Sequence, residues 1–379
     1  MSPPLNIAVA GLGTVGAGTV RLLQEHKDLL AKRTGREIAI KAVSARDRKR
    51  DRGIDLTGVD WQEDALALAD RSDIDAVVEL IGGSDGIARD LVTRSLEAGR
   101  HVITANKALL AHHGTELARI AEDNDVTLRF EAAVAGGIPI VKALREGLAA
   151  NRIERIYGIL NGTCNYILTT MRERGLDFEA VLAQAQDLGY AEADPGFDID
   201  GVDAAHKLAI LTALAFGSEI DFDAVHIEGI RRVTGDDIRY ADELGYRIKL
   251  LGIARRTDGG IEQRVHPCLV EKSTPIASVE DVYNAVVADG DFVETTVYQG
   301  KGAGAGPTSS AVVADLMDAA RGDCMPTFTI PAAGLSPANP ARLDERVGCF
   351  YICMTVRDEP GVMADITAIF RDEHISLES

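Results

Sequence analysis

The sequence predicts an α/β protein that begins with a doubly wound parallel sheet and continues into a differently built α+β domain. Three features of the 379-residue chain support this prediction. Apolar runs of strand length alternate with helical stretches over the first third, a glycine-rich turn joins the first run to the first helix, and the alternation ends after Pro139. Alternating strands and helices of these lengths favour a mostly parallel sheet with helices on both faces.

The first part should contain short buried strands separated by helices. The expected strands are Asn6–Ala10, Glu37–Val43, Ala76–Leu80, His101–Thr104 and Val126–Phe130. The expected helices are Gly16–Lys32, Ile87–Ala98 and Lys107–Asp123. In a sheet of this kind, ligands gather at the carboxyl ends of the strands. We therefore expect functional residues of the first part in the loops that follow its strands.

The second part mixes strands and helices without that regular alternation. Its expected strands are Ile153–Leu160, which runs into Asn161-Gly-Thr163, and then Tyr246–Arg255 and Gln263–Val270. Its expected helices are Ile167–Arg174, Phe178–Leu188 and the apolar Val202–Phe216. The glycine-dense stretch Gly300–Gly306 then precedes an expected helix, Ser309–Arg321. Glycines let a backbone approach a ligand closely, and a following helix offers free N–H groups.

The last part of the sequence is expected to be a linker and an incomplete third domain. Pro326–Pro340 holds four prolines and no charged residue, which is typical of a linker. Phe350–Val356 should form a strand and Val362–Asp372 a helix, but one strand and one helix cannot bury their own faces. The predicted division is a first domain over about 1–140 completed by 301–325, a second over 141–300, a linker over 326–345 and a partial domain over 346–379.

Composition excludes several classes of partner and location. The formal net charge is −19, from 59 acidic and 40 basic side chains, so nucleic acid and anionic membranes are poor partners. No apolar run approaches the roughly 18 residues of a membrane span. The opening Met1-Ser-Pro-Pro lacks a basic leader and cleavage site, and the five cysteines form no CxxC pair. We expect a protein of the reducing cytoplasm.

The turn Gly11-Leu-Gly13-Thr-Val-Gly16 predicts a dinucleotide site of the Rossmann type. It follows the first strand and opens the first helix. In such a motif the first glycine permits the tight turn, the second lets the pyrophosphate approach the backbone, and the third lets the helix pack on the strand. The alternative is a structural turn that binds no ligand.

The end of the second strand favours NADP over NAD. An NAD-selective enzyme usually has an acid there to bond the ribose hydroxyls, whereas the first charged residue here is Arg46, with more cations behind it. A guanidinium suits a 2′-phosphate because it donates to two oxygens at once. Asp47 leaves NAD possible, and the cations could also be a solvated basic loop.

The segment from Gly189 to Lys207 carries the richest chemistry in the chain. Five acids fall within twelve positions: Glu192, Asp194, Asp198, Asp200 and Asp203. Asp203 and Lys207 are four apart, hence on one face of a helix. On an outer helix that pair would be a minor salt bridge, but the leucines that follow predict a buried helix, and a partly desolvated lysine suits acid/base work. We interpret His206 as a packing residue.

Residues 189–207 resemble the signature segment of homoserine dehydrogenases: glycine and an aromatic residue, then Glu-x-Asp-Pro, Asp-Ile-x-Gly-x-Asp and a lysine four positions later. The likeness spans about residues 5–320. Other stretches match that family in the expected order: Gly11–Gly16, Thr104–Lys107, Glu131–Pro139, Gly158–Thr163 and Gly302–Pro307. The resemblance implies interconversion of homoserine and aspartate 4-semialdehyde with a nicotinamide dinucleotide, in the biosynthesis of threonine, methionine and isoleucine.

The resemblance also implies roles for individual residues. Lys207 would exchange the proton of the substrate hydroxyl, and Lys107 would hold that oxygen or relay the proton, the alternative for Lys107 being an ordinary surface lysine. The substrate-binding residues would be Glu192, Asp203, Asp198 and Thr163, with Glu192 and Asp203 on the ammonium and a structural cap equally open for Asp198. The cofactor-binding residues would be Gly11, Gly13, Thr14, Val15, Gly16, Arg46, Lys107, Gly189 and Gly304.

Three further expectations rest on the resemblance alone. A sodium ion would lie at Glu131, Val134, Gly136 and Ile138, held largely by main-chain carbonyls, although a plain glycine turn before Pro139 accounts for the residues equally well. The chain would form a homodimer or homotetramer. The tail resembles the opening of an ACT domain, a regulatory module that can bind an amino-acid effector, and only about half of one is present.

Two other functions remain open at this stage. An aspartate-semialdehyde dehydrogenase would need a thiol nucleophile paired with histidine, and Cys164 is the cysteine that lies inside a motif. A catalytically silent sensor would bind ligands without turnover and would have no use for the Asp203/Lys207 pair.

Overall fold

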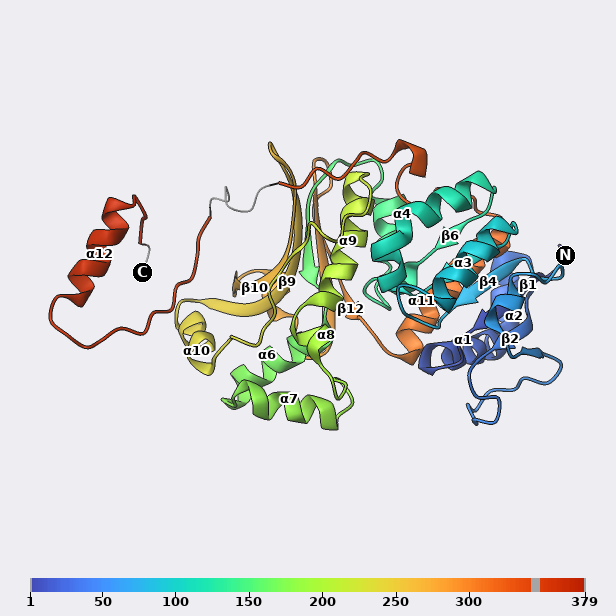
Figure 1. Cartoon of the computed structure of the whole chain (residues 1–379), viewed down its shortest axis with the longest axis horizontal. Helices are drawn as coiled ribbons and strands as arrows, with labels where there is room; N and C mark the ends of the chain where they lie inside the picture. Colours follow the sequence, from blue (N-terminus) through green and yellow to red (C-terminus); the bar gives the residue numbers. More distant parts are fainter. Residues whose placement is uncertain (1, 342–347, 378–379) are drawn as a thin grey trace. The chain divides into compact units, whose positions relative to one another are not determined.

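The computed structural model describes residues 2–341 and 348–377. The chain forms two compact units, Met1–Asp344 and Glu345–Ser379 (Figure 1). The first unit contains two six-stranded sheets, and its interior is divided among several apolar clusters. In the described chain, no helix is both long enough and apolar enough to cross a membrane.

The first sheet confirms the predicted doubly wound fold. Its strands are β1 (Leu5–Ala10), β2 (Ile38–Ser44), β3 (Asp60–Gln62), β4 (Ala76–Glu79), β5 (His101–Thr104) and β6 (Leu128–Arg129). They are all parallel and lie in the order β3-β2-β1-β4-β5-β6, which is the Rossmann order. Ala10 pairs in register with Ser44 and Glu79, and Glu79 with Thr104, so these strands end at one edge of the sheet.

Helices cover this sheet, with two differences from the predicted elements. The helices are α1 (Thr14–Glu25), α2 (Lys27–Thr34), α3 (Ile87–Glu97), α4 (Lys107–Asp123) and α11 (Ala305–Arg321), with short 3₁₀ turns η1 (Ala65–Leu68) and η2 (Glu131–Ala133). The single helix expected over Gly16–Lys32 is two helices, because His26 leaves the helical conformation. The helix expected from Ser309 begins at Ala305. It packs on α1 so closely that a Cβ at Gly18 would lie 2.6 Å from the Ser309 hydroxyl.

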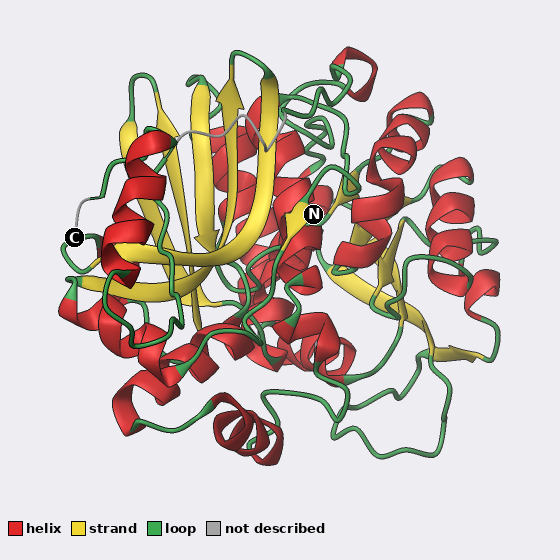
Figure 2. Cartoon of the chain, turned by 60° about the vertical axis from the view of Figure 1, so that its left-hand side comes forward, coloured by secondary structure: helices red, strands yellow, loops and turns green. Residues whose placement is uncertain are grey.

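The second sheet is mixed and larger than predicted. Its strands are β7 (Ile153–Ile159), β8 (His226–Ile227), β9 (Tyr246–Thr257), β10 (Gly260–Glu271), β11 (Tyr283–Gly290) and β12 (Glu294–Lys301), in the order β12-β11-β7-β9-β10-β8. All neighbours are antiparallel except β8 and β10. Sequence reasoning missed β11 and β12. Figure 2 shows the long strands of this sheet side by side.

The helical elements that accompany this sheet are α5 (Ile140–Lys142), η3 (Ala143–Gly147), α6 (Gly162–Arg174), α7 (Phe178–Asp187), α8 (Gly196–Ile199), α9 (Val202–Phe216), α10 (Gly235–Glu243), η4 (Pro275–Ser278) and η5 (Ala332–Gly334). Helix α6 begins five residues earlier than expected, since the Asn161 side chain caps it at Gly162. Every residue of α9 except Val202 and Ala215 is buried. This helix packs on β7, β9 and β10 on one side and on α4 on the other (Figure 1).

The proline-rich stretch Pro326–Pro340 is not the free linker that its composition suggested. Phe328 is fully buried, and its ring lies 5.9 Å from that of Phe130. The amide of Ala332 donates to the Glu122 carboxylate at the end of α4 at 2.7 Å. The Thr329 hydroxyl donates to the Leu214 carbonyl near the end of α9. The four prolines lack backbone N–H donors, but the segment still packs against both α4 and α9. We call residues 326–340 the strap.

In the second unit, the predicted helix is present as α12 (Val362–Asp372), but the predicted strand is not. Residues 350–356 are extended without regular secondary structure, and their apolar side chains are exposed. A β-strand is defined by ladder hydrogen bonds to a neighbouring strand, and the described residues 350–356 take part in no such ladder. The expected helix is therefore confirmed, and the expected strand over Phe350–Val356 is not found.

Candidate active site

Two lysines and one aspartate meet where helices α4 and α9 begin. Lys107 is the first residue of α4, directly after β5, and Asp203 lies in the first turn of α9. Lys207 Nζ lies 2.6 Å from Asp203 Oδ2, and Lys107 Nζ lies 3.3 Å from Asp203 Oδ1. Each carboxylate oxygen of Asp203 therefore faces a different ammonium group. Residues a hundred positions apart are joined into one ionic centre.

The junction between β7 and α6 holds this centre in place. Lys207 Nζ donates to the Leu160 carbonyl at 2.8 Å, and the Asn284 amide donates to the same carbonyl at 3.0 Å. The Asn161 amide donates both to Asp203 Oδ2 at 2.9 Å and to Asp198 Oδ1 at 2.8 Å. The centre thus contains Lys207, Asp203 and Asp198 from the signature segment, together with Lys107 from the Thr104–Lys107 stretch.

Sequence reasoning missed three parts of this arrangement: the Leu160 carbonyl, Asn161 and Asn284. Asn161 stood in the quoted Gly158–Thr163 motif, but an asparagine between a strand and a helix has an ordinary explanation as a helix cap. Asn284 lies on β11, which has no short-range signal connecting it to residue 160. A main-chain carbonyl leaves no mark on the sequence at all.

Burial and charge set the protonation of the acids. Burial pushes the pKa of Asp203 upward, but the ammonium groups of Lys207 and Lys107 pull it down further, to about 2. Burial and the neighbouring Asp203 raise the pKa of Asp198. The side chain of Lys107 is 34% exposed and that of Lys207 is 11% exposed, so Lys107 lies at the open side of the centre.

His206 behaves as a packing residue next to the lysine. Its ring lies 4.5 Å from that of Phe222 and 5.4 Å from that of Phe197. Burial lowers the pKa of His206 to about 4, so the ring is neutral near pH 7. Lys107 Nζ lies 5.7 Å from the centre of the Phe197 ring, which gives the site an aromatic wall.

The turn between β1 and α1 fits a dinucleotide. Gly11 has φ of +96°, and a Cβ at Gly16 would lie 1.9 Å from the Gly11 carbonyl oxygen, so both positions require glycine. A Cβ at Gly13 would meet nothing within 4 Å, which leaves open space in front of the turn. Helix α1 has no side-chain cap at its start and no acid in its first turn, so the N–H groups of Thr14 and Val15 are suited to a phosphate.

The basic loop after β2 carries one arginine that the sequence did not single out. Arg46 is exposed, so its guanidinium is accessible to a phosphate group or to water. Arg52 folds back instead: its Nε donates to the Leu12 carbonyl of the glycine turn at 3.0 Å, and its guanidinium lies 5.6 Å from the centre of the Trp61 ring. Arg52 thereby ties the basic loop to the glycine turn.

The glycine-dense stretch packs backbone to backbone against the segment that resembles a sodium site. A Cβ at Gly136 would lie 2.3 Å from the Gly302 carbonyl oxygen, and Gly304, with φ of +115°, starts α11. Glu131, Val134 and Ile138 are buried. The Glu131 carboxylate accepts the amides of Val141 and Lys142 at 2.9 and 2.8 Å, and its own amide donates to Asp315.

The loop before α8 does not join the lysine centre. Glu192 is exposed, and its main-chain carbonyl accepts from the Gln186 side chain at 3.0 Å. Gly189 is exposed with φ of +73°. The Thr163 hydroxyl, at the start of α6, donates to the Tyr190 carbonyl at 2.7 Å and so anchors this loop. The assignment of Glu192, Gly189 and Thr163 to the substrate or cofactor stays a prediction.

The buried thiol of Cys164 is a poor nucleophile. It donates to the Asp198 carbonyl at 3.3 Å and is fully buried. Burial raises the pKa of the Cys164 thiol, and the charges of Asp198 and Asp203 raise it further. These features argue against Cys164 as the nucleophile of a thiol-dependent dehydrogenase.

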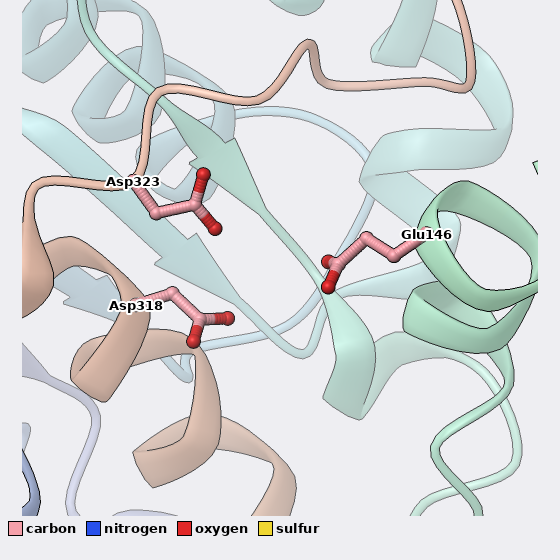
Figure 3. A group of neighbouring side chains, drawn as sticks. All are labelled: Glu146, Asp318 and Asp323. Atoms are coloured by element: carbon pink, nitrogen blue, oxygen red, sulfur yellow. The ribbon is translucent and has the colours of Figure 1, made fainter.

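A separate acidic group consists of Glu146, Asp318 and Asp323, whose carboxylates turn toward one another (Figure 3). Candidate ligand atoms of the three lie within 4.8 Å of one another. Buried arginines already offset their charge: Arg129 lies 3.2 Å from Asp323 and 3.7 Å from Asp318, and Arg145 lies 2.9 Å from Glu146. This pairing accounts for the acids as an ionic network within the fold.

Comparison with known proteins assigns the family. The family model for the homoserine dehydrogenase NAD binding domain matches residues 11–131, and the model for homoserine dehydrogenase matches residues 139–317. Homoserine dehydrogenase from Neisseria gonorrhoeae is 48% identical over 382 residues, covering 99% of this chain and 87% of that protein. The crystal structure of a homoserine dehydrogenase from Thiobacillus denitrificans superposes with a TM-score of 0.92 at 46% identity, covering 100% of this chain and 88% of that one.

A more distant structure adds a ligand. A hyperthermophilic archaeal homoserine dehydrogenase in complex with NADPH matches with a TM-score of 0.71 at 26% identity, covering 83% of this chain and 97% of that one. The family models together span most of the first unit, including the glycine turn and both lysines. The chain therefore belongs to the homoserine dehydrogenase family of nicotinamide-dependent oxidoreductases.

Proposed function

We propose that Lys207 is the acid/base group with which this chain interconverts homoserine and aspartate 4-semialdehyde. The carrying observation is the position of its Nζ, buried between the Leu160 carbonyl and Asp203 and sharing that carboxylate with Lys107. In the oxidation direction, the substrate hydroxyl gives its proton to a lysine amine as its carbon loses a hydride. The nicotinamide dinucleotide, when bound, supplies the hydride acceptor or donor.

Lys107 is proposed to hold the reacting oxygen or relay its proton to solvent. Its side chain is about a third exposed and its ammonium group touches Asp203 on the oxygen that Lys207 leaves free. A proton taken up by Lys207 can pass by way of Asp203 to Lys107 once the Lys107 ammonium group has released a proton to solvent on the open side of the centre. The difference in exposure supports different roles for the buried Lys207 and the more accessible Lys107.

Substrate recognition is proposed to come from the acids around this centre. A protonated amino group prefers a desolvated carboxylate, and Asp203 and Asp198 are held within reach of each other by Asn161. Glu192 and Thr163 would complete the substrate site, with Glu192 supplied by the exposed loop that Thr163 anchors. The domain division predicted from the sequence is proposed as well, with cofactor and substrate regions meeting where α4 and α9 begin.

The cofactor site is proposed to comprise the glycine turn with Thr14 and Val15, together with Lys107, Gly189 and Gly304. NADP is proposed as the preferred dinucleotide on the strength of Arg46, which is exposed beyond β2, and of the related enzyme that binds NADPH. A sodium ion is proposed at the main-chain carbonyls of Glu131, Val134, Gly136 and Ile138, in a segment that is buried and packed tightly on Gly302.

Assembly, regulation and location remain proposals from the family resemblance. We propose a homodimer or homotetramer, an amino-acid effector for the ACT-like tail and a cytoplasmic location. The exposed apolar residues of α12 and of the preceding extended segment support a further partner for the tail.

Replacing Lys207 by methionine tests the assignment. The methionine keeps the apolar stem and removes the ammonium group, so kcat should fall by roughly 10²–10⁴-fold, the usual contribution of a positioned acid/base. Dinucleotide affinity, measured by fluorescence titration, should stay unchanged. Lys249→Met is the matched control. Lys249, on β9, is another buried lysine; it pairs with Glu280 and contacts none of Lys107, Asp203 and Lys207. Equal losses of kcat in the two variants would contradict the proposed role.

A further inference from the structure

We infer that Asn161 is a positioning residue for this reaction: its amide ties the carboxylates of Asp198 and Asp203 together and fixes the Asp203 oxygen that faces Lys207. The inference rests on the proposed function, because it assumes that Lys207 performs the proton transfer. It assigns a role to a residue that resembles, in sequence, an ordinary helix cap.

Every polar atom of the Asn161 side chain is occupied. Its Oδ1 accepts the amide of Cys164 at 2.8 Å and thereby caps α6, while its Nδ2 donates to Asp198 Oδ1 and to Asp203 Oδ2. The side chain is buried, with 4% of the residue exposed. The amide cannot turn over, because its oxygen would then face two carboxylates. The helix cap therefore fixes the direction in which the two N–H groups point.

The acceptor on Asp203 gives this contact its significance. Asp203 Oδ2 accepts from Asn161 and from Lys207, whereas Oδ1 faces Lys107. Without the Asn161 amide, the Asp203 carboxylate could rotate about its χ2 bond and change which lysine it engages. The preceding residue, Leu160, contributes its carbonyl to the same Lys207 ammonium. Adjacent residues of one strand-to-helix junction thus hold both members of the Lys207/Asp203 pair.

The amide also lowers the cost of placing two acids side by side. A neutral donor shared by two carboxylates favours their charged forms, as it does for Asp203 and Asp198 here. The titratable groups that face the two acids come from each surrounding element. They are Lys107 on α4, Cys164 on α6, and His206 and Lys207 on α9.

Two substitutions separate positioning from capping. Serine and aspartate are both good N-cap residues, so Asn161→Ser and Asn161→Asp keep an acceptor for the Cys164 amide. Serine is too short to reach the two acids, and aspartate replaces their donor with a third carboxylate. Thr234→Ala is the matched control, because Thr234 caps the exposed helix α10 and touches neither acid nor lysine in the site. Steady-state kinetics with homoserine, dinucleotide titration and thermal unfolding are measured for all three variants.

We expect kcat/KM to fall roughly tenfold to a hundredfold in Asn161→Ser, the loss that corresponds to a hydrogen bond to a charged group. Dinucleotide affinity should be unchanged. The acid limb of the pH profile of kcat/KM should move to higher pH in both variants, because loss of the donor favours proton uptake by the ionic centre. The movement should be larger in Asn161→Asp than in Asn161→Ser, because the aspartate also adds a third carboxylate to the centre. Should the serine variant fail to fold, the aspartate variant, which has the size of asparagine, carries the test.

An unmoved acid limb in both variants, with kcat/KM reduced no more than in Thr234→Ala, would show that Asn161 is only a cap and would overturn the inference. The Lys207→Met experiment separates this failure from that of the proposed function. Turnover that persists without Lys207 removes the chemistry on which Asn161 would act. Turnover lost without Lys207, with the pH profile of the Asn161 variants unmoved, refutes the positioning role alone.

Discussion

Truncating Phe328 to alanine should destabilise the first unit, although its sequence context looks like a linker. Phe328 is fully buried in the strap that joins the ends of α4 and α9, with its ring against Phe130. Truncating a buried phenylalanine to alanine lowers the free energy of unfolding by about 3–5 kcal/mol. Unfolding a unit of about 340 residues carries an entropy of roughly 0.7 kcal/mol per degree, so Tm should fall by about 4–7 °C.

The matched control is Phe292→Ala, which removes the same side chain at a position that is 88% exposed. The measurement is thermal unfolding by circular dichroism for both variants at one protein concentration. We expect Phe292→Ala to stay within about 1 °C of the parent, as surface substitutions usually do. A Tm for Phe328→Ala that matches Phe292→Ala would refute the packing argument and restore the linker interpretation of the segment.

Three further predictions concern the cofactor and substrate. Gly13→Ala should weaken dinucleotide binding in a titration without lowering Tm, since its Cβ meets no protein atom within 4 Å, whereas Gly16→Ala should lower both because its Cβ would strike the Gly11 carbonyl at 1.9 Å. Arg46→Ala should raise KM for NADP much more than for NAD, and equal changes would mark Arg46 as a solvated loop residue. Glu192→Gln should lower kcat/KM for homoserine by roughly ten- to a hundredfold but barely affect an analogue without the amino group. Equal losses for both substrates would exclude Glu192 from ammonium binding.

Local sequence patterns were sufficient to predict the glycine turn and the buried helix α9. The order of glycines in Gly11–Gly16 predicted a turn between a strand and a helix because two of those positions cannot hold a side chain. The leucines after Lys207 predicted a buried helix, and α9 is buried along almost its whole length. The spacing of Asp203 and Lys207 predicted their contact, since residues four apart share a helix face.

Elements stabilised by distant partners were harder to predict. The strand β12 alternates only between exposed and half-buried positions, and the glycine-rich stretch at its C-terminal end obscures its boundary. Its existence therefore depends on pairing with β11, which its own residues do not indicate. The strap over 326–340 looks unstructured because prolines dominate it, yet Glu122 and Leu214 give it fixed partners. At residues 350–356 the error is the opposite one: a strand was predicted, and the described residues there form none.

The candidate site shows the same division between what a sequence identifies and what only packing supplies. Lys107 and Lys207 were recognisable individually, one after a strand and one on a buried helix, but no spacing rule relates residues a hundred positions apart. Their contact depends on α4 packing against α9. The strap contacts both helices, and the β7–α6 junction holds the Asp203 carboxylate through Asn161. Because Lys207 is held by a main-chain carbonyl, the side chain at Leu160 can vary without loss of that contact. Asn161 cannot vary in the same way, since its side chain must accept from Cys164 while it donates to two acids. In the proposed mechanism, therefore, the two lysines handle the proton, and the junction between β7 and α6 positions Lys207 and Asp203.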